Sequence, residues 1–123
     1  TVEVVSPEPH RNCITKENRY ESIGMAQLTP LVKNEVDKMS WNDYYMALPY
    51  FMLDGINSEG VVCNTNVVPT GDYGITTGTN PSKPNLCGIA IVRYILDNAN
   101  SVDKAIELLY DKNIWMPQSS NFA

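Results

Sequence analysis

The chain has 123 residues, of which 43% are hydrophobic and 19% charged, and its formal net charge is −5 at pH 7. This length supports one domain at most, and the composition is that of a folded protein. Nine basic residues against fourteen acidic ones, with no basic run, exclude nucleic acid and anionic membrane surfaces as expected partners. No apolar run approaches the ~20 residues that span a bilayer, so we expect neither a membrane span nor a signal peptide.

The cysteine and histidine pattern bounds the chemistry further. Cys13, Cys63 and Cys87 are an odd number of cysteines, and the chain has no Cys-x-x-Cys and only one histidine. A zinc site is therefore not expected, and we predict no metal and no cofactor. A reducing, cytoplasmic location is the simpler interpretation, with a secreted form that has lost its signal as the alternative.

The sequence begins at Thr1 without a methionine and ends at Ala123. We interpret it as a piece cut from a longer protein, with a processed N-terminus as the other possibility. An N-terminal Thr can act as nucleophile and base together. Nothing in the Val-Glu-Val-Val run that follows supports that role, so Thr1 is interpreted as a cut site.

Two short strands are predicted first. Residues 2–5 form a β-branched run that the prolines at 7 and 9 stop. Residues 20–26 form the second predicted strand, with side chains alternating between two faces. Tyr20, Ser22, Gly24 and Ala26 share one side, and Ile23 and Met25 share the other. Residues 32–45 are ambiguous between a helix and a solvated loop.

The segment 48–69, LPYFMLDGINSEGVVCNTNVVP, is predicted to form a β-hairpin. Its first strand is expected over 48–53 and its turn over 54–60, where Gly, Asp and Asn supply turn chemistry. The return strand is expected over 60–68, with side chains alternating between two faces. One face carries Val61, Cys63, Thr65 and Val67, and the other carries Val62, Asn64, Asn66 and Val68.

A long loop and two helices complete the pattern. The connection from 69 to 85 is longer than usual for a compact domain, which favours a functional loop or disorder. One helix is expected over 86–98, with Asn85 as its N-cap and Ile89, Val92, Ile95 and Leu96 on its apolar face. A second is expected to begin after the N-cap Ser101 and stop at Asn113, with Val102, Ala105, Ile106 and Leu109 on its apolar face. Strands grouped before helices argue for an α+β fold, with both helices packed on one sheet face.

The strongest chemical signal in the residues themselves is the Asn64-x-Asn66 pair. Asn is a poor strand former and costs free energy when buried without partners. An amide on a rigid strand can donate to a developing oxyanion, which is typically worth about 2.7–4 kcal/mol to an acyl transfer. The alternative, that these amides face solvent or satisfy nearby backbone groups, stays open.

Other candidates favour structural roles. Asp54 and Glu59 are possible paired carboxylates, but turn formation is the favoured role of Asp54. His10 has no Ser or Cys motif beside it, so a catalytic triad is unsupported. Cys63 and Cys87, the latter at the start of a predicted helix, are interpreted as small core residues. The glycines at 71, 74 and 78 do not form a phosphate-binding loop, because no Gly-Lys-Ser/Thr follows them.

Residues 54–61, DGINSEGV, resemble the choloylglycine hydrolase family, the linear amide C–N hydrolases that include conjugated bile salt hydrolases and penicillin V acylases. The family pattern there is Asp-Gly-Met-Asn-Glu-x-Gly-Leu, followed by a strand that ends in Asn and then Pro. Residues 101–105, SVDKA, match the family's Ser-Val-x-x-Ala, and 112–114, KNI, match the end of that helix. A weaker similarity covers 19–25, so the resemblance spans nearly the whole chain.

The resemblance implies an N-terminal-nucleophile hydrolase with an αββα sandwich, of which residues 1–123 would be one partial, central domain. In this family an N-terminal Cys attacks the amide carbonyl, its α-amine serves as base, and an Asn on the hairpin strand helps form the oxyanion hole. Asn66 is the best match to that Asn, with Asn64 as a substitute because the spacing to the Pro differs by one residue. The nucleophile and its Arg and Asp helpers are expected upstream of Thr1, and a later Asn and Arg beyond Ala123.

The resemblance therefore predicts a hydrolase of conjugated bile salts, penicillin V or related acyl amides in the full-length bacterial protein. No cysteine inside the chain has a free amine, so the 123-residue chain itself is expected to be inactive. Tyr73 and Ile75 of the long loop are expected to line the acyl pocket. We expect a small-molecule amide substrate, no nucleic acid, no membrane and a homo-oligomer. The alternative is a non-catalytic α+β binding or assembly domain.

Overall fold

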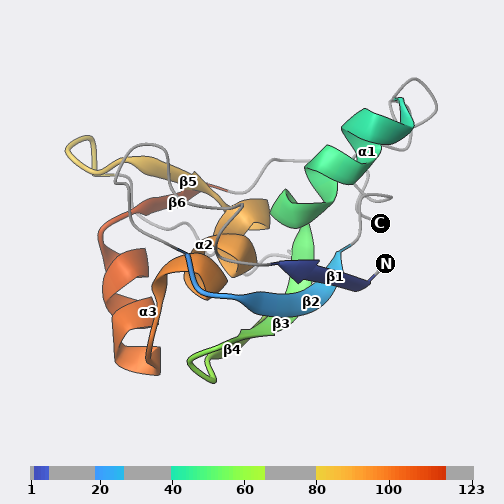
Figure 1. The fold of residues 1–123 in the computed structure, drawn as a ribbon. Coiled ribbons are helices and arrows are strands. Elements are labelled where there is room, and N and C mark those ends of the chain that lie inside the picture. The colour runs from blue at the N-terminus through green and yellow to red at the C-terminus, as the bar shows by residue number, and fades with distance from the viewer. Residues whose placement is uncertain (1, 6–18, 27–39, 66–79, 116–123) are drawn as a thin grey trace, which may run out of the picture.

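The computed structural model describes residues 2–5, 19–26, 40–65 and 80–115, and every structural statement below concerns these residues. They form an α+β fold, as expected, with a four-stranded antiparallel sheet, a two-stranded parallel sheet and three α-helices (Figure 1). The strands are β1 (Val2–Val5), β2 (Ser22–Ala26), β3 (Met52–Asn57), β4 (Val62–Asn64), β5 (Asn85–Cys87) and β6 (Asn113–Trp115). The helices are α1 (Trp41–Ala47), α2 (Ile91–Asn98) and α3 (Val102–Tyr110), with 3-10 turns η2 (Leu48–Tyr50) and η3 (Gly88–Ala90).

The larger sheet is an antiparallel meander in the order β1-β2-β3-β4. The prediction for β1 is confirmed, and β2 begins two residues later than expected. Its alternation is confirmed: Ser22, Gly24 and Ala26 are buried, while Ile23 and Met25 are about 45% and 44% exposed. One face of the sheet is therefore covered and the other open.

The predicted bounds of the first hairpin strand, 48–53, are wrong. Leu48–Tyr50 forms a 3-10 turn rather than a strand, with Pro49 in its first positions. Proline supplies a fixed φ and needs no hydrogen-bond acceptor there. The strand instead runs from Met52 to Asn57, through the segment 54–56 that was predicted as turn.

The turn role predicted for Asp54 is also wrong, because the residue lies inside β3. This strand pairs with β2 on one edge and β4 on the other, so its backbone hydrogen bonds on both edges outweigh the poor strand propensity of Asp and Gly. The register shifts between Met25 and Ala26, so that Leu53 is an extra residue in β3. The Asp54 carboxylate accepts a hydrogen bond from the Met25 amide at 3.1 Å beside this bulge.

Two glycines on the covered face of the sheet leave room for close packing, with α2 at Gly55 and within the sheet at Gly24. Gly24 and Gly55 are directly paired across β2 and β3. A Cβ at Gly55 would lie 2.6 Å from Leu96 Cδ1, and one at Gly24 would lie 2.3 Å from the Asp54 carbonyl oxygen. The side chains of Met52, Val92 and Leu96 fill the space beneath them as one fully buried cluster.

The predicted helix 86–98 begins late. Asn85 is not its N-cap, and Cys87 does not open it, because Asn85–Cys87 forms β5 in parallel with β6. The α-helix begins at Ile91 after a 3-10 turn. Val92, Ile95 and Leu96 are buried against β3 and β4, which confirms the predicted face at these positions.

The predicted N-cap of α3 is confirmed, since Ser101 Oγ accepts a hydrogen bond from the Lys104 amide at 3.1 Å. Its predicted apolar face is only partly right. Ala105 is buried with Val61, Ile95 and Ala99, whereas Val102 is 67% exposed and Ile106 47% exposed. Asn113 lies beyond the helix and begins β6.

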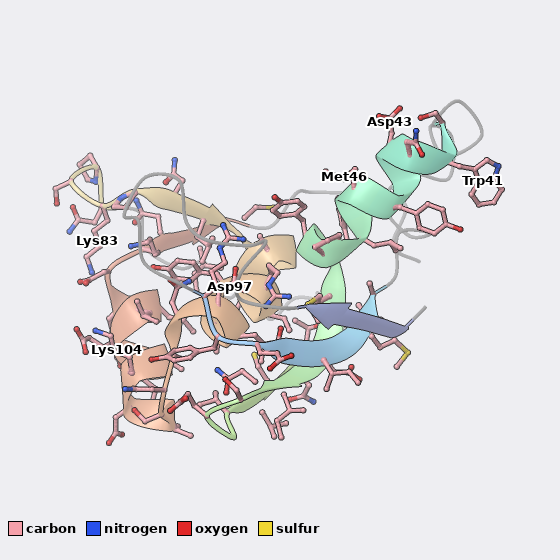
Figure 2. All side chains as sticks on the ribbon, in the orientation of Figure 1. Trp41, Asp43, Met46, Lys83, Asp97 and Lys104 are labelled. Atoms are coloured by element: carbon pink, nitrogen blue, oxygen red, sulfur yellow. The ribbon has the colours of Figure 1, made fainter. Side chains whose placement is uncertain are left out.

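The segment 32–45, which the sequence left ambiguous between a helix and a solvated loop, is helical from Trp41, where α1 begins. Residues 32–39 lie outside the described part of the chain. Figure 2 shows Trp41 and Met46 on α1, which extends away from the sheet. No helix among the described residues is long and apolar enough to cross a membrane.

A buried ion pair ties α2 to the sheet. Arg93 lies 2.5 Å from Asp97 and donates hydrogen bonds to Ser22 Oγ at 2.7 Å and to the Met52 sulfur at 3.1 Å. Asp97 also pairs with Arg19 at 3.3 Å. Both members of the central pair are almost fully buried, and Figure 2 shows Asp97 in the interior of the fold.

Candidate functional site

Asn64 is the predicted site residue that the structure describes. It is the last residue of β4 and is paired with Asp54 of β3. The alternation of the return strand is confirmed here: Val61 is buried and Cys63 half-buried toward α2, whereas Val62 and Asn64 are exposed on the opposite face. Asn66, Tyr73 and Ile75 lie outside the described residues.

Asn64 lines a shallow hollow of about 680 Å³ on the open face of the sheet. The polar groups of this hollow are Asp54 and Asn64. Its apolar walls are Ile23, Met25, Ile56 and Val62. In the described part of the fold, α2 lies against the other face of the same sheet (Figure 1).

This arrangement places two polar side chains beside four apolar ones on the open face of the sheet. The Asn64 carboxamide carries two N–H donors, which can bind a carbonyl oxygen. The Asp54 carboxylate already accepts the Met25 amide, so its primary task here is to complete the hydrogen bonding of the bulge. The four apolar side chains offer a surface on which another apolar layer can pack.

Cys63 does not have the environment of a nucleophile. Cys63 is half-buried, and this burial raises the pKa of its thiol above the ordinary value, which disfavours the reactive thiolate. Cys87 is half-buried at the end of β5. Their prediction as small core residues agrees with this partial burial, while Cys13 and His10 lie outside the described residues.

Asn57 is a buried polar residue next to the return strand whose role sequence reasoning missed. Its side chain is 5% exposed, and its carboxamide makes four hydrogen bonds. The oxygen accepts from the amides of Glu59 and Val61, and the nitrogen donates to the carbonyls of Leu96 and Ala99. The sequence signal was its position in the Asp-Gly-Ile-Asn motif, which was interpreted as ordinary turn composition.

Glu59, the other acidic residue considered, is exposed in the turn after β3. Within the described ranges, no group of three or more His, Cys, Asp and Glu side chains is arranged to hold a metal ion.

Comparison with known proteins gives one family. The model of the acyl-coenzyme A:6-aminopenicillanic acid acyl-transferase family matches residues 6–123, which is nearly the whole chain. The matched range includes the β3–β4 hairpin, the residues that line the hollow, and the helices α2 and α3. No curated protein and no solved structure matches significantly.

Proposed function

Because the chain belongs to the acyl-coenzyme A:6-aminopenicillanic acid acyl-transferase family, of the choloylglycine hydrolase and penicillin acylase group, we propose that its protein cleaves linear amides. The observation that carries the proposal is the family match over 6–123. This membership bears out the resemblance found at residues 54–61 and 101–105, and it does not favour a non-catalytic binding domain.

The proposed reaction uses an N-terminal cysteine of the intact protein. Its thiolate attacks the amide carbonyl carbon, a C–S bond forms, and the C–N bond breaks as the amine leaves with a proton. Water then attacks the thioester and releases the acid and the thiol. In an acyl-transferase an amine takes the place of water in this second step, so hydrolysis and transfer share the acyl-enzyme.

Asn66 is proposed as the donor to the oxyanion of the tetrahedral intermediate, with Asn64 as its substitute. Support comes from the place of Asn64 at the end of β4, where it is exposed on the open face of the sheet. Tyr73 and Ile75 are proposed to contribute to the acyl pocket. We propose small acyl amides such as conjugated bile salts or penicillin V as substrates and a cytoplasmic, homo-oligomeric enzyme of bacterial origin.

A second sheet is proposed to cover the open face, completing an αββα sandwich. Four side chains support this, since Ile23, Met25, Ile56 and Val62 are between 41% and 69% exposed on that face. A sheet face with this much exposed apolar surface is typical of one that packs against another layer.

The test is to express the full-length protein and assay it with glycine- and taurine-conjugated bile acids, penicillin V and fatty-acyl amides. The released amine is measured, and 6-aminopenicillanic acid is added in a parallel series to detect acyl transfer. We expect turnover of at least one amide, and an Asn66→Ala variant slowed by about 10²–10³-fold in kcat. No turnover of any amide would contradict the proposal.

The Asn64→Ala variant is compared with Asn66→Ala in the same assay, because it separates the two candidate donors. The variant with the larger loss in kcat identifies the oxyanion donor. Full activity in both variants would exclude the hairpin strand from the oxyanion hole.

A further inference from the structure

We propose that Asn57 is a positioning residue that fixes the return strand β4 on α2 and thereby sets the location of the Asn64 carboxamide at the end of that strand. The inference rests on the proposed function, because it gives this carboxamide a reacting carbonyl to meet. Asn57 itself lies on the covered side of the sheet and does not line the hollow.

On the turn side, Asn57 holds the chain as it reverses direction. Its Oδ1 accepts hydrogen bonds from the Val61 amide at 2.9 Å and from the Glu59 amide at 3.1 Å. The Asn57 amide in turn donates to the Val61 carbonyl at 3.1 Å. The Asn57 carbonyl also accepts from the Gly60 amide at 2.9 Å, so four hydrogen bonds join this one residue to the turn that leads into β4.

On the helix side, Asn57 Nδ2 donates to the Ala99 carbonyl at 2.7 Å and to the Leu96 carbonyl at 3.1 Å. Both carbonyls belong to the C-terminal end of α2, where backbone acceptors have no partner within the helix. The side chain therefore satisfies buried groups of the helix while it holds the strand.

Only a carboxamide of this length uses all four positions. Its two N–H donors bind the helix, and the two lone pairs of its oxygen bind the turn. The group is buried, so each of these hydrogen bonds constrains its orientation.

Strand β4 depends on this anchor because it is short. It has three residues and pairs with β3 alone among the described strands. A displacement of about 1 Å in a catalytic group can cost 10²-fold in rate. Loosening the turn at Asn57 is therefore expected to move Asn64 and its neighbours enough to affect the reaction.

The test compares three variants of the full-length protein: Asn57→Asp, Asn57→Ser and Ser101→Ala. Asn57→Asp keeps the acceptor for the turn and loses the donors to α2. Asn57→Ser keeps a short acceptor that can form a related turn. Ser101→Ala is the matched control, because it removes a cap of α3 and so lowers stability without touching β4.

The first measurement is the alkylation rate of Cys63, read by peptide mass spectrometry after iodoacetamide treatment. Cys63 lies on β4 and faces α2, so detachment of the strand exposes it. We expect roughly tenfold faster alkylation in both Asn57 variants and no comparable change in Ser101→Ala.

The second measurement is the kinetics of the best amide substrate. We expect kcat to fall by about 10²-fold in the Asn57 variants while KM changes little, and Ser101→Ala to keep its kcat. The kcat values are expressed per folded molecule, with the folded fraction measured by circular dichroism. A purely structural role would lower only that fraction and would leave both kcat per folded molecule and KM unchanged.

The outcomes separate the two proposals. Unchanged alkylation and kcat in both Asn57 variants would overturn the inference, as would faster alkylation with unchanged kcat. Unfolding of both variants at 25 °C, with Ser101→Ala still folded, would also overturn it in favour of a structural role. If the wild-type protein cleaves no amide, the proposed function fails, and the alkylation rates still decide whether Asn57 holds β4.

Discussion

Arg93 carries a full charge into the interior between α2 and β2. Its guanidinium is close to three other groups there: the Asp97 carboxylate at 2.5 Å, the Ser22 hydroxyl at 2.7 Å and the Met52 sulfur at 3.1 Å. A buried charge of this kind is tolerated because its partners replace the water that it loses. The contribution of the Arg93–Asp97 pair to stability is therefore measured best by removing one of its two members.

The substitution Arg93→Leu is expected to lower the free energy of unfolding by about 3–5 kcal/mol, because it removes the buried positive charge that lies 2.5 Å from the buried Asp97 carboxylate. Urea denaturation measures the loss. The double variant Arg93→Leu/Asp97→Leu is the control, and it is expected to recover much of the stability. A loss below about 1 kcal/mol in the single variant would contradict a structural role for the pair.

Cys63 gives a pH-dependent prediction. Burial raises the pKa of its thiol above the ordinary value of 9.0, so the unfolded chain releases this proton more readily than the folded one. Its contribution to stability is therefore complete below pH 9.0 and is lost as the pH rises through the raised pKa of the folded state. The free energy of unfolding of the wild type and of Cys63→Ser is measured by urea denaturation at pH 7 and pH 10. Between these two pH values, the wild type is expected to lose more of it than Cys63→Ser does. A constant difference would contradict the burial of this thiol.

At the scale of the elements, the close pairing of β2 with β3 and the turn before β4 use glycine for different reasons. Gly24 has no room for a side chain, since an added Cβ would lie 2.3 Å from a backbone oxygen. Gly60 has open space around it but a φ of +80°, which side chains rarely adopt.

We therefore expect Gly24→Ala to destabilise the protein more than Gly60→Ala. The first forces the backbones of β2 and β3 apart or distorts the bulge, with a cost of about 3 kcal/mol or more. The second costs only the strain of a left-handed residue, about 1–2 kcal/mol. Thermal unfolding followed by circular dichroism ranks the two variants. Equal losses would mean that β2 and β3 are less closely packed than the structure shows.

At the scale of the whole molecule, the open sheet face carries exposed apolar side chains. Its apolar residues lie on the side opposite α2, where a second sheet is proposed to pack. Val62 on this face and Val102 on α3 have nearly the same exposure, 69% and 67%, in the described structure. They form a matched pair for testing whether the intact protein covers this face.

In the full-length protein, Val62→Lys is expected to lower the free energy of unfolding by about 2–3 kcal/mol, because a charge would be forced into the proposed sheet interface. Val102→Lys is expected to change it by no more than about 0.5 kcal/mol. Denaturant titration of both variants is the measurement. Equal, small effects would contradict a covered face and the proposed sandwich.

The sequence by itself determined the α+β class, the alternation of β2 and of residues 61–64, the Ser101 cap and the family. Each of these depends on local spacing or on a motif, which can be read without knowing the neighbours in space. Strand periodicity places side chains on faces, and a cap needs only the first turn of its helix.

The tertiary structure decided where β3 begins and ends, the parallel pairing of β5 with β6, and the role of Asn57. Asp54 and Gly55 are poor strand residues, yet they lie in a strand because β2 and β4 pair with it on both edges. Asn57 contacts carbonyls 39 and 42 residues away along the chain. No local pattern carries such a partnership, because it exists only once α2 has packed on the sheet.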